Sequence, residues 1–490
     1  MTQRLRILLD TNVLIPLHDT QQVLEQNLAN FVRLASVGGH QLLHHPATIA
    51  DFERDPDTSR KARNLERIRQ FPALQNPAPC LRNTPNTNAN DSCDNEILYA
   101  LECDAVHALV TEDKGIRAKA RRQGLIHRVY SIQTAEDWLR RLHETHQVVL
   151  PNIQDVPLHS LTPELANEFF DSLRLGYIGF DDWFRTKARE NRMAWVYRSD
   201  SGALAAICIY ATQTDEAINS TGQRLPGKAL KLCTFKVGET VRGRKIGELF
   251  LKAAFRYATA NACENLFIHA GVGHQDFLLP LLEDFGFEPL GDYDGDVVLV
   301  KAHPLIAPTS TSTPPLEYAR KYFPHFRTDG AVQKFLIPIK PEFHNILFPD
   351  YSTAQGQLFD SVSSVGNAIK LAYLCRAQTN AIKAGDIVLF YRTRDEQAVT
   401  SIGVVEQFDV LSDAAKIASL VSRRTVFSIK EIDEMAKRPT KVILFRLVQH
   451  FVNSPTYDAL ETARIVNGPI QSICKISDAS FSKLLAIAGR

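Results

Sequence analysis

The sequence of 490 residues lacks the features that mark several special classes of protein. No run of about 18 apolar residues is present, so no transmembrane helix is expected. The eight cysteines lie far apart without a C-x-x-C pair, which argues against a zinc site or a disulfide framework. The first residues enter a predicted strand without the apolar stretch of a secretory signal. We therefore expect a cytoplasmic protein with reduced cysteines and no membrane contact.

What the sequence does contain is typical of a soluble globular protein. Hydrophobic residues make up 44% of the chain and charged residues 23%, and the length corresponds to about three domains. A stretch rich in Pro, Ser and Thr at 304–315 has the composition of a stiff linker. These features predict an α/β multidomain protein, divided into residues 1–150, 151–303, a linker at 304–330, and 331–490.

Two aspartates follow short hydrophobic strands in the first part of the chain. Asp10 comes directly after the predicted strand Ile7–Leu9, and Asp113 follows a second predicted strand that ends at Val110. In an open α/β sheet, ligands bind outside the carboxyl ends of parallel strands. The two aspartates are therefore expected to share one crevice.

Two further acids are candidates for the same crevice. Asp94 opens a predicted helix at 95–103, and Asp51 lies on an early helical turn. Converging carboxylates repel one another unless a cation lies between them, and their hard oxygens favour Mg²⁺ or Mn²⁺. The pattern predicts metal-assisted phosphodiester hydrolysis. The alternative is that Asp10 and Asp94 are simply helix N-caps, a role that suits aspartate.

Residues 4–145 resemble the PIN-domain nucleases. The motifs that carry the resemblance are Asp10-Thr11-Asn12, Asp94, and Thr111 with Asp113. The second acid of the family corresponds to Asp51 or Glu53, which point about 200° apart on a helix, so only one can face the crevice; we favour Asp51. The resemblance implies a metal-dependent ribonuclease with Asp10, Asp51, Asp94 and Asp113 as catalytic residues. It also implies that Asp10, Asp94 and Asp113 bind Mg²⁺ or Mn²⁺.

A cluster of basic residues follows Asp113 and includes Arg117 and Lys119. Because it lies beside the expected metal site, we expect these two side chains to contact the phosphates of an RNA strand. The alternative is a solvated face of a helix.

The middle segment has a strand, a glycine-containing basic loop and then a helix. The strand is predicted at 230–237 and the helix at 248–260, with the loop Val241-Arg-Gly-Arg-Lys-Ile-Gly247 between them. Backbone N–H groups of a loop that opens a helix form a natural anion site. The loop therefore predicts binding of a phosphate-containing ligand.

This segment resembles the GNAT acetyltransferases, in which the loop reads Arg/Gln-x-x-Gly-x-Gly/Ala and binds the pyrophosphate of acetyl-CoA. Arg242 and Gly247 match, whereas Lys245 stands at the first glycine and Leu282 at the usual tyrosine. The resemblance implies a site for acetyl-CoA made of Arg242, Gly243, Arg244, Lys245, Ile246 and Gly247. Transfer to an amine also needs a base. The sequence leaves four candidates open: Asp215, Glu216, Glu239 and His269, although a histidine in a strand is more often a packed core residue.

The last third of the chain resembles PUA-like barrels of the ASCH and EVE type. The resemblance rests on a Gly-Asp turn at 385–386 before a strand, and on Gly403-Val404-Val405-Glu406. It implies a small β-barrel that binds RNA or modified bases, with Tyr391 and Arg392 in contact with RNA. Phe390 and Tyr391 alternate along a strand, so one belongs in the core; we expect Tyr391 outside.

The three resemblances together suggest a metal-dependent ribonuclease with an attached acetyl-CoA-binding domain, acting on RNA and possessing a toxin-like role. Two alternatives remain. The protein is primarily an N-acetyltransferase with a docking PIN domain, or it is a non-catalytic nucleic-acid binder regulated by CoA. The sequence assigns neither an antitoxin nor an oligomeric state.

Overall fold

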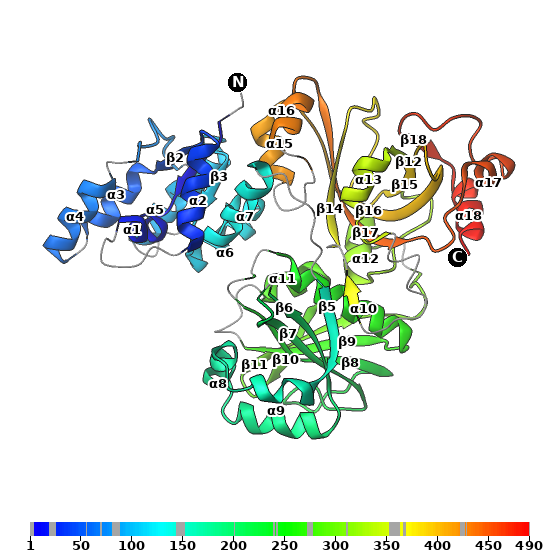
Figure 1. Ribbon diagram of the computed structural model, residues 1–490, viewed down its shortest axis with the longest axis horizontal. Helices are drawn as coiled ribbons and strands as arrows, with labels where there is room; N and C mark the ends of the chain where they lie inside the picture. Colours follow the sequence, from blue (N-terminus) through cyan, green and yellow to red (C-terminus); the bar gives the residue numbers. More distant parts are fainter. Residues whose placement is uncertain are drawn as a thin grey trace. The chain divides into compact units, whose positions relative to one another are not determined.

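The computed structural model divides the chain into two compact units, residues 1–147 with 410–442 and residues 148–409 with 443–490 (Figure 1). The residues that it describes are 4–18, 26–54, 56–68, 71–80, 89–143, 152–199, 201–238, 241, 244–271, 278–309, 312–351, 363–365, 369–421, 427 and 429–489. Within them, none of the helices is both long and apolar enough to cross a membrane. All eight cysteines are free thiols, as expected.

The first unit contains a sheet of four parallel strands in the order β2-β1-β3-β4. Its central strand is a run of apolar side chains buried on both faces, which is typical of a parallel sheet covered by helices. The predicted parallel α/β sheet is therefore confirmed. The strands are β1 (Arg6–Leu9), β2 (Gln41–His44), β3 (Ala108–Val110) and β4 (Val129–Tyr130).

Helices from two distant parts of the chain belong to this unit. Those from the first part are α1 (Thr11–His18), α2 (Gln26–Val37), α3 (Pro46–Glu53), α4 (Thr58–Ile68), α5 (Ala89–Glu102), α6 (Lys114–Arg122) and α7 (Ile132–His143). Those from the last third are α15 (Ala414–Val421) and α16 (Ile429–Ala436). α15 is attached by a hydrogen bond of 3.4 Å from the Tyr130 hydroxyl to the Ser419 carbonyl and by an ion pair of 2.7 Å between Lys416 and Asp104. The sequence did not indicate that residues 410–442 complete the first unit.

The second unit contains a mixed sheet of eight strands in the order β10-β11-β9-β8-β7-β6-β5-β13. Among its pairs, β8 and β9 run parallel, and the others run antiparallel. The strands are β5 (Asn152–Pro157), β6 (Met193–Arg198), β7 (Leu204–Thr214), β8 (Lys228–Val237), β9 (Asn265–Gly271), β10 (Glu288–Tyr293), β11 (Asp296–Ala302) and β13 (Ser363–Val365). The strand predicted at 230–237 is confirmed as part of β8.

Helices cover both faces of this sheet (Figure 1). One face carries α8 (Asp171–Gly176) and α9 (Phe180–Arg189), whose apolar side chains form a core with β6 and β7. The other face carries α10 (Ile246–Ala260) and α11 (Leu278–Asp284), which pack in a separate core with β8 and β9. A ligand on either side of the sheet is thus surrounded by a different set of helices.

A second sheet in this unit is built from the last third of the chain. Its strands are β12 (Lys334–Ile339), β14 (Lys370–Cys375), β15 (Ile387–Arg392), β16 (Ala398–Leu411), β17 (Thr440–His450) and β18 (Cys474–Ile476). Their order is β14-β17-β16-β15-β12-β18, with β14 and β18 at open edges, so the described strands do not close into the expected barrel. The helices beside them are α12 (Pro315–Lys321), α13 (Pro341–Leu347), α17 (Tyr457–Thr462) and α18 (Asp478–Ile487).

The segment expected to be a linker, 304–330, contributes described residues to both cores of this unit. Phe323 belongs to the core around α10, whereas Ala319 and Phe326 belong to the core of the second sheet. The apolar side chains at 318–326 explain this result, because they interrupt the polar composition of residues 304–315.

Candidate functional site

The two parallel strands of the mixed sheet separate at their carboxyl ends. β8 and β9 are paired only from Ala229–Asn265 to Leu232–Ile268, although both strands continue beyond that point. The separation coincides with a β-bulge, since Leu232 and Thr234 pair with adjacent residues of β7 and leave Cys233 as the extra residue. The carboxyl ends of parallel strands are where α/β sheets bind ligands.

A pocket of about 390 Å³ lies at this separation, on the face that carries α8 and α9. A volume of this size falls within the range of small-molecule sites. Its lining comes from the turn between α8 and α9, from α9 and the turn after it, from β7 and the loop after it, from β8 and β9, and from the start of β11: Tyr177, Ile178, Phe180, Trp183, Lys187, Arg192, Gln213, Glu216, Lys231, Cys233, Thr234, His269 and Asp296.

His269 lies on β9 directly after Ile268, the last residue of β9 that pairs with β8, and it lines this pocket. Its Nε2 atom is 2.9 Å from the carbonyl oxygen of Ile218, and its ring stacks on Tyr293. Burial lowers the pKa of His269, and the charge of Lys231 lowers it further. A carbonyl can only accept a hydrogen bond, so the neutral imidazole carries its proton on Nε2 and has a free lone pair on Nδ1.

Other ionisable side chains of the pocket are paired. Lys231 forms an ion pair of 2.6 Å with Glu216, and the Tyr177 hydroxyl donates to Asp296 over 3.3 Å. Burial raises the pKa of Cys233, although Arg192 lies 3.3 Å from its sulfur, so the thiol stays protonated. Of the bases left open by the sequence, Asp215 is exposed beside Arg224 outside the pocket, and Glu239 lies outside the described residues.

The amino end of α10 lies on the opposite face of the sheet from the pocket. Lys245 is its N-cap in the left-handed conformation (φ 60°), and no side chain caps this end of the helix. A left-handed conformation is one that glycine adopts more readily than lysine. Arg244 is exposed and Ile246 is buried, whereas Arg242 and Gly243 lie outside the described residues.

Two contacts limit what can replace residues at this terminus. A Cβ atom on Gly247 would lie 2.7 Å from the end of the Leu281 side chain, so that side chain would have to move to admit a larger residue. Leu282, at the position of the usual tyrosine, is fully buried in the core. A protein hydroxyl at that position is therefore not available to donate a proton.

The first turn of α10 is also joined to the second sheet. The Lys245 ammonium donates to the Lys370 carbonyl over 2.9 Å, and the Lys370 amide donates to the Glu248 carboxylate over 3.2 Å. Nearby, the fully buried Arg446 pairs with Asp284 at 2.9 Å and with Glu406 at 2.7 Å. Lys370 also pairs with both of these carboxylates. This network could not be predicted from the sequence, because Arg446, Asp284, Glu406 and Lys370 are single charged residues in four separate elements.

In the first unit, the two predicted strand-end motifs do meet. The Thr111 hydroxyl donates to Asp10 over 2.7 Å, and the Asn12 amide donates to Thr111 over 3.3 Å. The pKa of Asp10 is raised to about 6, mainly by burial and also by the charges of Asp94 and Asp113, against the lowering effect of the hydrogen bonds from Thr111 and Thr11. Three carboxylates from separate segments therefore act on one another.

The surroundings of these acids differ from expectation in three respects. Asp94 lies inside α5, which begins at Ala89, and does not open the helix. Lys119, expected to contact RNA, forms ion pairs of 2.7 Å with Asp91 and 2.8 Å with Asp94. Asp113 is the exposed N-cap of α6 and accepts from the Ile116 amide.

The remaining predictions for this unit are not resolved. The Asp51 side chain lies outside the described residues, so the choice between it and the exposed Glu53 stays open. Arg117 is partly buried on α6. Within the described part of the chain, no group of three acidic, histidine or cysteine residues has an arrangement that could hold a metal ion.

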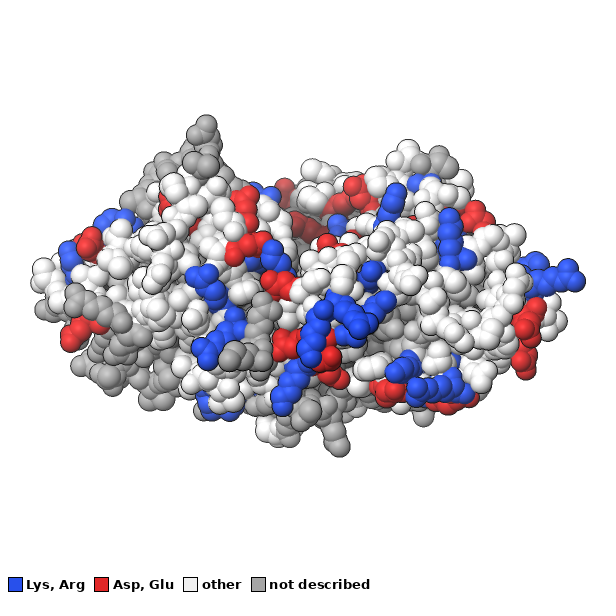
Figure 2. Space-filling view, turned by 90° about the horizontal axis from the view of Figure 1, so that it is seen from above, with Lys and Arg blue, Asp and Glu red and all other residues white. Residues whose placement is uncertain are grey.

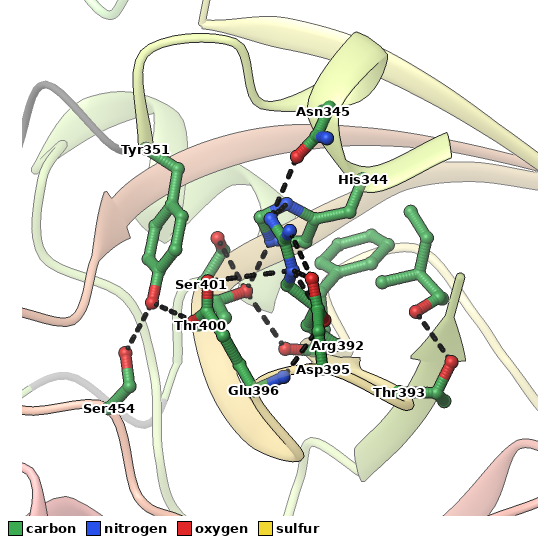
Figure 3. Close-up of polar contacts among 12 residues, drawn as sticks. His344, Asn345, Tyr351, Arg392, Thr393, Asp395, Glu396, Thr400, Ser401 and Ser454 are labelled. Atoms are coloured by element: carbon green, nitrogen blue, oxygen red, sulfur yellow. Dashed lines mark hydrogen bonds and ion pairs between the residues drawn. The ribbon is translucent and has the colours of Figure 1, made fainter. Parts of the chain in front are cut away.

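A polar network occupies the second sheet where RNA contact was expected (Figure 3). Arg392 donates to Asp395, to Asn345 and to His344 Nδ1, and His344 Nε2 lies 2.8 Å from the Thr400 hydroxyl. Burial, Arg392 and His450 lower the pKa of His344 to about 3, so this histidine is neutral. Arg392 is thus engaged with protein groups.

The prediction that Tyr391 is exposed is wrong. Only 4% of its surface is accessible, and it packs in the core of the second sheet. β15 lies between β12 and β16 and is covered on both faces, so Phe390 and Tyr391 are both buried.

On the face of the molecule shown in Figure 2, cationic and anionic side chains lie interspersed.

The comparisons with known proteins give limited information. No family model matches the chain, and no curated protein matches it. Among solved structures, an ASCH protein of Zymomonas mobilis is similar over 31% of this chain and 94% of its own, with 17% identity and a TM-score of 0.24. An IAA acetyltransferase of Bacillus cereus is similar over 30% of this chain and 96% of its own, with 14% identity and a TM-score of 0.22. Similarities this weak carry no argument about activity.

Proposed function

We propose that this protein is an N-acetyltransferase of the GNAT type. It transfers the acetyl group of acetyl-CoA to an amine bound in the pocket of about 390 Å³ that is lined by His269. The observation that carries the proposal is the separation of β8 from β9 at a bulge, with the pocket on one face and the amino end of α10 on the other. Parallel strands that part in this way leave an opening through the sheet at which two ligands can meet.

The side chains of β8 support an approach of the two substrates from opposite faces. Leu230 and Leu232 point toward the core with α10, whereas Lys231 and Cys233 line the pocket. Because successive side chains of a strand alternate between faces, the pocket and α10 lie on opposite sides of the sheet at this point. The donor then comes from the side of α10 and the acceptor from the side of α9.

The amino end of α10 fits a pyrophosphate group. The helix has 15 residues and no side-chain cap, so its backbone N–H groups and its dipole favour an anion. Lys245 and the exposed Arg244 add positive charge at the same end. Acetyl-CoA supplies an activated acyl group, while the protein orients the amine and removes its proton.

His269 is the base that the geometry favours. It lines the pocket where the strands separate, and its Nδ1 lone pair is the free acceptor of a neutral imidazole. Because its pKa is lowered, the imidazole remains able to accept a proton at pH values below the usual 6.5. Glu216 is less suited, since Lys231 neutralises it at 2.6 Å.

The test is His269→Ala with acetyl-CoA and a panel of primary amines. Loss of a general base should lower kcat by about 10²–10⁴-fold with a smaller change in KM. His159→Ala, which removes an exposed histidine of the same domain outside the pocket, is the matched control. Unchanged turnover in His269→Ala would exclude this base, and failure of the intact protein to bind acetyl-CoA in calorimetry would refute the transferase proposal.

A second candidate function is metal-dependent hydrolysis of RNA in the first unit. The observation that favours it is that Asp10 is buried near Asp94 and Asp113: burial, with a smaller contribution from the charges of these two acids, raises the pKa of Asp10 to about 6. Hard carboxylate oxygens suit Mg²⁺ or Mn²⁺, which would relieve this repulsion. The chemistry supplied by such an ion is activation of water for attack on a phosphodiester.

Binding of the ion can be measured without the reaction. Mn²⁺ should raise the melting temperature of the intact protein, and the increase should vanish in Asp10→Asn. RNA cleavage should be lost in the same variant. Glu53→Gln, an exposed carboxamide substitution in the same unit, tests whether Glu53 is the fourth acid. An Mn²⁺ effect of equal size in Asp10→Asn would argue against a metal at this cluster.

A further inference from the structure

The pocket has two ends of opposite charge. At one end, Lys187 and Arg192 share a single carboxylate, Glu190, at 2.9 Å and 3.2 Å. Two cations with one anion leave this end with an excess of one positive charge. Only 15% of the Arg192 side chain is accessible, so its charge is concentrated at the pocket and screened little by solvent.

The other end carries an excess of negative charge. Asp296 accepts from the Tyr177 hydroxyl at 3.3 Å, and the nearby His269 is neutral. Lys231 and Glu216 neutralise each other at 2.6 Å and add no net charge. Asp296 therefore lacks a cationic partner within the described lining of the pocket, and it can pair with an ammonium group.

An apolar wall connects these two ends. It comes from the α8–α9 turn and from α9, where Phe180 and Trp183 stack on each other and Ile178 is fully exposed at the rim. Aromatic and aliphatic side chains in a pocket favour an apolar group of a ligand. The volume of about 390 Å³ accommodates a single small molecule.

We propose that the acceptor is a free α-amino acid with an apolar side chain. Its carboxylate binds Arg192 and Lys187, its ammonium group faces Asp296 and His269, and its side chain contacts Trp183. This substrate class rests on the proposed acetyl transfer at the same pocket. A ligand that carries both a carboxylate and an ammonium group pairs with the cationic and the anionic side chains of the pocket, whereas a simple amine leaves Arg192 and Lys187 without an anionic ligand group.

The proposed reaction is balanced within this pocket. The bound ammonium group gives one proton to His269 Nδ1, and the nitrogen lone pair so freed forms a bond with the acyl carbon of the thioester. The carbon–sulfur bond breaks, the sulfur leaves with the electron pair, and the second proton lost by the nitrogen ends on the sulfur. The products are an N-acetylamino acid and free CoA thiol. Arg192 is a binding residue in this scheme and takes no part in the proton transfer.

Calorimetry with three related ligands tests the proposal on the intact chain. L-Phenylalanine should bind at least about tenfold more tightly than L-phenylalaninamide, which keeps the amine and ring but lacks the negative charge. Phenylpropionate, which lacks the amine, should also bind more weakly. Equal affinity for L-phenylalanine and its amide would overturn the proposal and indicate an acceptor without a free carboxylate, such as the amino end of a peptide.

The preference should depend on Arg192. Arg192→Gln should abolish the discrimination between L-phenylalanine and its amide, and Lys187→Gln should reduce it. Arg185→Gln is the matched control, because Arg185 lies on α9 and pairs with Asp182 but does not line the pocket. Because Arg192 also contacts Cys233, Lys187→Gln keeps the test valid if Arg192→Gln fails to fold. Unchanged discrimination in Lys187→Gln together with a folded Arg192→Gln would overturn the proposal.

The outcome separates this inference from the proposed function. Turnover of phenylalaninamide in preference to phenylalanine would remove the amino-acid assignment and leave the transferase intact. Binding of L-phenylalanine that depends on Arg192, without any binding of acetyl-CoA, would support the pocket assignment and refute acetyl transfer.

Discussion

Asp10 in the first unit and Asp284 in the second are both carboxylates among other charged side chains, and their pKa values move in opposite directions. Burial and, to a smaller extent, the neighbouring acids raise the pKa of Asp10 to about 6. Burial also acts to raise the pKa of Asp284, but Arg446 and Lys370 outweigh it and hold the pKa below the usual value.

The difference lies in the balance of charge. Around Asp284 and Glu406, two cations face two anions and join α11 to the second sheet. Around Asp10, three carboxylates are brought together while Lys119 pairs with Asp94 and Asp91. The first arrangement holds elements together, whereas the second lowers the stability of the folded state. Such unbalanced clusters are typical of functional sites.

The largest effect is expected from Arg446→Met. It leaves Asp284 and Glu406 with one cation between them, so the free energy of unfolding of the second unit should fall by about 3–5 kcal/mol. Denaturant unfolding followed by tryptophan fluorescence measures it, with Trp138 replaced by Phe so that Trp183 and Trp195 report on this unit.

Two comparisons sharpen this result. Arg394→Met removes an arginine that is 65% exposed and 3.8 Å from Glu342, and it should change stability by at most about 1 kcal/mol. Arg446→Met combined with Glu406→Leu restores equal charge and should recover part of the loss. If Arg446→Met and Arg394→Met lowered the free energy of unfolding by similar amounts, the ion pairs around Asp284 and Glu406 would not stabilise the second unit.

A smaller effect of opposite sign is expected from Asp10→Asn. Because the folded-state pKa of Asp10 is raised, its protonated form is favoured by folding, and that stability is lost as pH rises from about 3.8 through about 6. At pH 7 the asparagine should therefore stabilise the first unit by about 1–3 kcal/mol. Unfolding at pH 7 and pH 3.5 checks this, since the gain should disappear at the lower pH. A destabilised variant at pH 7 would show that the hydrogen bonds of Asp10 outweigh the repulsion.

The smallest effect is expected from Lys119→Met. Its ammonium group bridges Asp91 and Asp94, whose side chains are 25% and 21% exposed, so solvent screens part of the attraction. We expect a loss of about 1 kcal/mol at pH 7. The exposed Arg122 on the same helix provides the control variant Arg122→Met. Equal stability of the two variants would show that Lys119 does not reduce the repulsion between the carboxylates of Asp91 and Asp94.

Local patterns were enough to predict the strands that carry the candidate sites. Apolar runs ending in polar residues gave β1 before Asp10 and β3 before Asp113, and the hydrogen bond between Asp10 and Thr111 joins the two ends. The order of strand, loop and helix at β8 and α10 was also predicted, because a helix after a basic glycine-containing loop is visible within a short segment.

Features that depend on distant residues could not be predicted. Asp284 pairs with Arg446, which lies 162 positions away in the sequence. The pocket is lined by Arg192, Lys231 and Asp296, which come from separate parts of the chain. Tyr391 was a missed signal of another kind, because the unbroken apolar run Ile387–Tyr391 is itself typical of a strand buried on both faces. Because Tyr391 is buried, its side chain is not available to stack on an RNA base.

The two helices that residues 410–442 add to the first unit affect the order in which the parts of the chain can fold during synthesis. Ile417, Ala418 and Val421 of α15 are fully buried, so that unit lacks part of its core when residue 147 has been synthesised. At about 5–20 residues per second, the missing helices follow roughly 15–60 s later. The first unit can therefore complete its core only after most of the polypeptide has been synthesised.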